Sequence, residues 1–140
     1  MVQSRSINLN INRIVSYRQF CNKIWNSFKF AMTKFEHIKV FDPSLIDPSK
    51  ENFLNSWILA KLHKTIRQVN QSFTTYTLGE SANAFYNFWL YELCDVYLEA
   101  TKPIFISGSP EEKGQTALVL FICLETGMRL LHPMMPFISE

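Results

Sequence analysis

The stretch Tyr17–Phe35, YRQFCNKIWNSFKFAMTKF, has the spacing of one long amphipathic helix. With successive residues about 100° apart, its apolar side chains fall within one arc of roughly 120°. These side chains are Tyr17, Phe20, Cys21, Ile24, Phe28, Ala31, Met32 and Phe35. Such a stripe predicts a helix that packs against a core. We place the helix at residues 12–37, with Asn12 as its cap and residues 1–11 as an extended lead-in.

The opposite side of this helix is polar and basic, and it carries Arg18, Asn22, Lys23, Asn26, Lys29, Thr33 and Lys34. Phe30 lies in the middle of that side, which predicts an exposed ring between amides and cations. Such a ring is a candidate platform for a nucleic-acid base. Trp25 lies at the border of the two faces, and we expect it in the core. For Asn22 the sequence leaves two roles open: a contact to RNA, or a hydrogen bond that caps or links to a neighbouring helix.

Three further helices follow from apolar spacing and from start and stop signals, at residues 53–73, 78–101 and 110–131. Two Asp-Pro pairs predict a loop over residues 38–52. Lys102-Pro103 is expected to end the third helix, with Ile104–Ile106 as a short extended piece. Ser109-Pro110-Glu111-Glu112 is a strong start signal for the fourth. Residues 137–140 begin a last helix that is truncated here. The fold class is therefore all-α, a bundle of four main helices plus a truncated fifth, in one domain over residues 1–140.

Charge is unevenly distributed along the chain. Residues 1–40 hold seven cations and one acid, whereas residues 41–140 hold seven cations and eleven acids. This asymmetry predicts a positive field on one side of the molecule, centred on the first helix. The simple interpretation is a solvated basic face, and the functional one is RNA binding. No uninterrupted apolar run of about 18 residues occurs, so we expect no membrane span. Three cysteines without metal-ligand spacing are typical of reduced thiols, so we expect a cytoplasmic protein.

The sequence offers no catalytic motif. It has no P-loop, dinucleotide fingerprint, GxSxG or HExxH pattern. Cys21, Cys94 and Cys123 lack metal-ligand spacing and are expected to be reduced core residues. Asp95 and Glu99, one helical turn apart, are interpreted as structural acids near a tyrosine or an arginine, in preference to an acid/base pair. We therefore expect no catalytic residue, no metal site and no cofactor within these 140 residues.

The chain nevertheless resembles a known family. The motif YRQFCNKIWNSFKF at 17–30 is similar to the first helix of the anticodon-binding domain of valyl-tRNA synthetases, which are class I enzymes. The resemblance continues in collinear order through SINLNINRI at 6–14, SWILAKL at 56–62, ELCDVYLEATKP at 92–103 and RLLHPMMPFISE at 129–140. Within these motifs and between them, we interpret Trp57, Trp89, Tyr97 and the HPMMPF stretch at 132–137 as packing residues.

The resemblance implies a C-terminal part of a larger enzyme that joins valine to its tRNA with ATP and Mg²⁺. Catalysis and editing would belong to the parent enzyme, and the lead-in would come from its catalytic domain. The implied partners are the anticodon stem-loop of tRNA(Val) and the catalytic domain of the same chain, with the fragment itself a monomer. Two alternatives remain: the equivalent domain of an isoleucyl or leucyl enzyme of class Ia, and a helical scaffold or protein-interaction module that binds no RNA.

The resemblance also implies site residues. In the methionyl relative, an Asn and an Arg one helical turn apart read the anticodon, after an Asn-Lys pair that here is Asn22-Lys23. The Asn corresponds to Asn26, and the Arg falls on Lys29 or Phe30. A second reading residue follows the proline after the third helix. Here it is Ile104, next to Phe105, which would form a second wall. Phosphate contacts are expected from Arg18, Lys23 and Lys34.

Overall fold

The computed structural model describes residues 10–38, 42, 44, 46 and 52–140. Their regular structure is helical throughout, which confirms the all-α class. The elements are α1 (Ile11–Met32), the 3₁₀ turn η1 (Phe35–His37), α2 (Phe53–Thr74), α3 (Leu78–Asn87), the π-helical segment η3 (Phe88–Leu98), α4 (Glu99–Ser107), α5 (Pro110–Leu131) and α6 (Pro136–Ser139). Most of the loop predicted for residues 38–52, and residues 1–9 of the lead-in, lie outside the described residues.

Local side-chain caps set where the helices begin. The Asn10 side chain, and not that of Asn12, accepts from a backbone N–H at the start of α1, 2.9 Å away. Asn52 caps α2 in the same way at 2.8 Å. At α5, Ser109 and Glu112 form the complete reciprocal capping box. These bonds satisfy N–H groups that have no partner within the helix.

The third helix does not end near residue 101, so this prediction is wrong. Pro103 lies inside α4, and α3, η3 and α4 form one continuous helix through Ser107. Ile104–Ile106 are therefore helical and not extended. Proline removes one N–H donor, but its fixed φ is itself helical. Burial of Thr101 and Phe105, on either side of Pro103, offsets part of the lost hydrogen bond.

The π-helical register of η3 decides which of its side chains are buried. Buried residues come in adjacent pairs, 88/89, 93/94 and 97/98, so the repeat alternates between five and four residues. This is wider than the α-helical repeat of 3.6 residues. Tyr91 and Val96, which α-helical spacing places among the apolar set, are about half exposed as a result. Trp89 and Tyr97 are fully buried, as their interpretation as packing residues requires.

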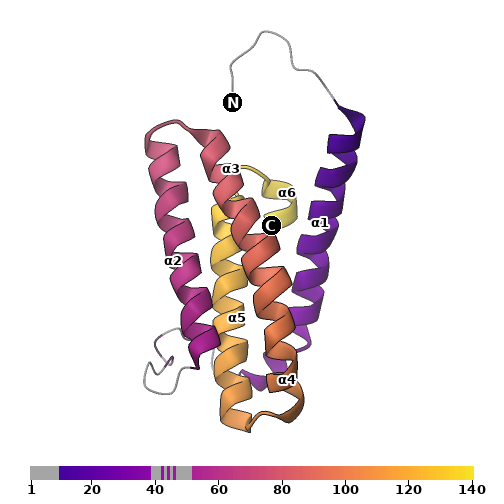
Figure 1. The fold of residues 1–140 in the computed structure, drawn as a ribbon, viewed down its shortest axis with the longest axis vertical. Coiled ribbons are helices and arrows are strands. Elements are labelled where there is room, and N and C mark those ends of the chain that lie inside the picture. Colours follow the sequence, from indigo (N-terminus) through magenta and orange to yellow (C-terminus); the bar gives the residue numbers. More distant parts are fainter. Residues whose placement is uncertain (1–9, 39–41, 43, 45, 47–51) are drawn as a thin grey trace.

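The long helices pack side by side around one core. In Figure 1, α1 and α2 lie on opposite sides of the view, with the continuous α3–α4 helix between them and α5 behind it. Contacts join α5 to each of the other α-helices. By length and composition α5 is apolar enough to cross a membrane, but half of that window is buried inside the bundle. Its composition is thus accounted for by its central place in the core.

The side of α1 that meets the bundle is narrower than the predicted stripe. Its buried residues are Ile24, Ser27 and Ala31, two of which are small. Trp25, expected in the core, is 59% exposed, and Tyr17 and Met32 are also exposed. The helix ends at Met32, five residues before the predicted end, and continues through a turn into η1. Small residues at the contact bring the α1 backbone close to the bundle and leave the flanking large side chains outside.

Candidate nucleic-acid interface

A hollow of about 230 Å³ opens between α1 and the helix formed by η3 and α4. It is lined by Lys23, Asn26, Ser27, Phe30, Cys94, Leu98, Glu99 and Lys102. Its lining combines one aromatic ring and one apolar side chain with an amide, a carboxylate and two ammonium groups. Three predicted site residues, Lys23, Asn26 and Phe30, are thereby brought together. Burial raises the pKa of the Cys94 thiol to about 11, which keeps this part of the lining neutral.

Phe30 is partly buried, and in this the structure corrects the expectation of an exposed ring. The ring packs against the core and forms a wall of the hollow. The Nζ atom of Lys34 lies 5.4 Å from the ring centroid, within cation–π distance. A ring held by packing on one side is a more rigid stacking surface than a freely exposed one.

Two ion pairs set the charge around the hollow. Lys23 on α1 donates to the carboxylate of Asp95 on η3 at 2.6 Å, and Lys102 donates to Glu99 at 2.7 Å. The hydrogen bond that Lys23 donates to the Asp95 carboxylate raises the pKa of Lys23. Asp95 and Glu99 each pair with a lysine, and not with the tyrosine or arginine that we expected beside them. Lys23 is thus an ammonium already held by a carboxylate.

The predicted second wall is not an open surface. Phe105 is only 8% exposed, and the His37 ring stacks on it with a centroid distance of 6.0 Å. Its proximity to the first patch comes through Lys34, whose Nζ lies 5.6 Å from the Phe105 centroid. Ile104 is partly buried and does not line the hollow. Because the helix continues through Pro103, the Phe105 side chain is buried, and its ring lies within cation–π distance of Lys34.

The remaining predicted residues lie on the outer face of α1. Arg18, Asn22 and Lys29 are exposed there and do not line the hollow. The Nζ atom of Lys29 lies 5.8 Å from the centre of the exposed Trp25 ring. This face therefore presents a second aromatic–cation pair, which the sequence interpretation missed because it placed Trp25 in the core.

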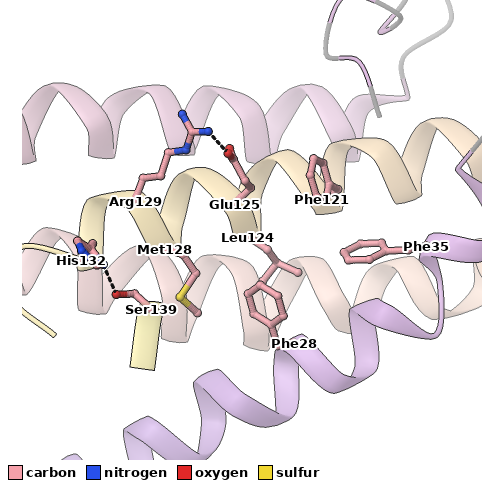
Figure 2. A pocket seen from close by; sticks show the side chains of 9 residues that line it. All are labelled: Phe28, Phe35, Phe121, Leu124, Glu125, Met128, Arg129, His132 and Ser139. Carbon is pink, nitrogen blue, oxygen red and sulfur yellow. Dashed lines mark hydrogen bonds and ion pairs between the residues drawn. The ribbon is translucent and has the colours of Figure 1, made fainter. Parts of the chain in front are cut away.

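A second hollow, of about 420 Å³, lies between α1, α5 and α6 and differs in chemistry. Figure 2 shows Phe28 of α1 and Phe35 of η1 pointing toward α5, where Phe121, Leu124 and Met128 complete an apolar lining. Its polar groups pair with one another, Arg129 with Glu125 and His132 with Ser139. Of the HPMMPF residues, His132 lines this hollow, whereas Phe137 is fully exposed and so is not the packing residue we expected.

The first hollow has the composition that an unstacked base requires. Base faces stack on aromatic or apolar side chains, and base edges bond to amide and charged groups. Its η3–α4 side, with Leu98, Glu99 and Lys102, is absent from the predicted site. The i, i+3 spacing of Glu99 and Lys102 was a visible signal, but only the structure shows that they face α1.

A helical bundle with this basic first helix and hollow fits a nucleic-acid-binding domain, and comparison defines the class. The chain belongs to the family of anticodon-binding domains of tRNA ligases, whose sequence model matches residues 55–140. It is similar to valine–tRNA ligases: 46% identical to that of Takifugu rubripes over 99% of this chain, and 43% identical to that of Homo sapiens over 100%. The mitochondrial enzyme 1 of Arabidopsis thaliana is 43% identical over 99%.

These similarities confirm the resemblance to the anticodon-binding domain of valyl-tRNA synthetases. The chain spans only 11–13% of the length of these relatives. Helix α1, which carries most of the predicted site, precedes the residues matched by the family model but lies within the regions aligned with the relatives.

Proposed function

We propose that this domain recognises the anticodon loop of a tRNA, and that it does so as part of a valine–tRNA ligase. The observation that carries the proposal is the hollow beside α1, where the Phe30 ring, the Asn26 amide and the Lys23 ammonium converge. A single-stranded loop exposes bases whose faces and edges match these groups. The family and the similarity to valine–tRNA ligases support valine's tRNA as the partner.

In this proposal, one base enters the hollow and stacks on Phe30, with Asn26 and the lining charges at its edge. Amide side chains discriminate between bases because they donate and accept at fixed positions. Arg18, Lys29 and Lys34 supply phosphate contacts, which add affinity without sequence information. Ile104 and Asn22 remain proposed neighbours of the bound loop, and Phe105 acts through Lys34.

The rest of the activity belongs to the proposed parent enzyme. It would join valine to tRNA in a catalytic domain that uses ATP and Mg²⁺ and packs against this bundle. A cytoplasmic location and a monomeric bundle are part of the same proposal. Since a second site on the enzyme would hold the acceptor arm, the affinity of this domain for a stem-loop alone is expected to be modest.

The test is a titration of the 140-residue chain with anticodon stem-loops of valine, isoleucine and leucine tRNAs, at two salt concentrations. We expect the valine stem-loop to bind most tightly, with an affinity that falls as salt rises. Preference for the isoleucine or leucine stem-loop would assign the domain to one of those ligases instead. Equal binding of all three at physiological salt would favour a scaffold with a solvated basic face.

A further inference from the structure

The ion pair between Lys23 and Asp95 joins the two sides of the hollow. Lys23 comes from α1 and Asp95 from η3, 72 positions later in the chain, and the Nζ–Oδ1 distance is 2.6 Å. Both side chains remain partly open to solvent, with 39% and 48% of their surfaces exposed. Lys23 lines the hollow, whereas Asp95 does not. Asp95 therefore lies behind the lining of the hollow, and its hydrogen-bonded contact there is Lys23.

A lysine held in this way differs chemically from a free one. The ammonium group sits on a flexible four-carbon stem and pairs with any phosphate within reach. Phosphate contacts carry no sequence information. A carboxylate that accepts one of the three N–H groups at 2.6 Å confines the ammonium and partly neutralises its field, while its other N–H groups stay free to donate.

We propose that Asp95 is a positioning residue, which holds Lys23 as an oriented donor toward an acceptor atom of the base in the hollow. The acceptor would be a carbonyl oxygen or a ring nitrogen of one unstacked nucleobase. This inference rests on the proposed function and deepens it, because it gives Lys23, which the sequence predicted as a phosphate contact, a defined role in base discrimination. It also gives a reason for the π-helical register, which places Asp95 opposite α1 while Cys94 and Leu98 stay buried.

The protein contains a matched control for this pair. Glu92 lies in the same segment and binds Lys61 of α2 at 2.7 Å, away from the hollow. Asp95→Asn and Glu92→Gln each remove one negative charge and one lysine pair from η3. Exposed ion pairs contribute little to folding, so Asp95→Asn is expected to fold normally. Asp95→Glu keeps the carboxylate and serves as the conservative variant.

The experiment measures Kd of each variant for the valine and isoleucine stem-loops at two salt concentrations. In Asp95→Asn, the freed Lys23 should strengthen binding of the isoleucine stem-loop and steepen the salt dependence. The ratio of the two Kd values should fall by about fivefold, the lower end of what one good base contact contributes to discrimination. Glu92→Gln should leave that ratio unchanged, and Asp95→Glu should retain most of it.

Two results overturn the positioning role alone: an unchanged ratio in Asp95→Asn, or an equal fall in Glu92→Gln, which would indicate a general charge effect. A wild-type chain without preference between the stem-loops overturns the proposed function, and the positioning role with it. The wild-type measurement therefore separates the failure of one from the failure of the other.

Discussion

The ammonium nitrogen of Lys34 lies 5.4 Å from the centre of the Phe30 ring. The same atom lies 5.6 Å from the centre of Phe105, so one cation joins a ring at the hollow to a ring at the end of the α3–α4 helix. Lys34 therefore links the patch at Phe30 to the buried Phe105 ring, which the sequence predicted as a second, separate wall. The Phe30 ring lines the hollow, and the Phe105 ring lies within cation–π distance of the Lys34 ammonium.

The first prediction concerns the Phe30 ring. Phe30→Leu keeps an apolar side chain against the core but removes the stacking face, and it should weaken binding of the valine stem-loop by about 1–3 kcal/mol. Isothermal titration calorimetry measures the change. Phe28→Leu is the matched control, since Phe28 is also a partly buried phenylalanine of α1 but lines the other hollow. Equal losses in both variants would show that Phe30 acts only through packing.

The second prediction concerns Lys34. Lys34→Met removes the charge between the two rings and should weaken all three stem-loops alike. The slope of log K against log salt should become shallower by about 0.7, the value for one phosphate contact with a single strand. Lys64→Met, at an exposed position on α2, is the control and should change neither quantity. A selective loss for the valine stem-loop would mean that Lys34 contacts a base instead.

Much of the fold could be predicted because its signals are local. The observed α5 has the predicted bounds, since a capping serine, a proline and a glutamate mark its start within four residues. The passage of the helix through Pro103 was not predictable in this way. It depends on burial of Thr101 and Phe105 against other helices, which outweighs the local preference of proline to end a helix.

The candidate site was predictable on one side only. Residues of α1 at the hollow follow from helical spacing within a single segment. Those of η3 and α4 do not, because an α-helical period of 3.6 misplaces side chains in a π-helical stretch. The burial of Trp25 was mispredicted for a related reason. Helical spacing shows which side chains share a face of α1, but it does not show which of them lies at the centre of the contact with the bundle. In the structure, the small residues Ser27 and Ala31 lie at that centre.

The third prediction tests the packing between η3 and α5. A Cβ atom on Gly127 would lie 2.6 Å from Cζ3 of the fully buried Trp89 ring. Gly127→Ala should therefore destabilise the fold by about 1–3 kcal/mol, as overpacking does in a dense core. Urea unfolding followed by circular dichroism measures the loss. Gly114→Ala, in the same helix, meets only the His37 carbonyl oxygen at 3.4 Å and should be neutral or stabilising. Similar effects of both substitutions would contradict the contact with Trp89.

The last prediction concerns the start of α5 and its pH dependence. The backbone N–H of Ser109 donates to the Glu112 carboxylate at 2.8 Å and lowers the Glu112 pKa below its ordinary value of 4.5. A carboxyl group whose pKa is lower in the folded state stabilises the fold above its unfolded-state pKa. That contribution is lost as the pH falls through the folded-state pKa.

Glu112→Gln removes this titration while keeping an oxygen that accepts from Ser109. The difference in unfolding free energy between wild type and Glu112→Gln should therefore be constant at neutral pH and shrink as the pH falls through 4.5 toward the lowered folded-state pKa of Glu112. Urea unfolding at a series of pH values measures it. Ser109→Ala removes the hydroxyl cap but leaves the backbone N–H, so it should lose about 1 kcal/mol and keep most of the pH dependence. A difference that stays constant as the pH falls well below 4.5 would show that the Glu112 carboxylate contributes nothing to the cap through its charge.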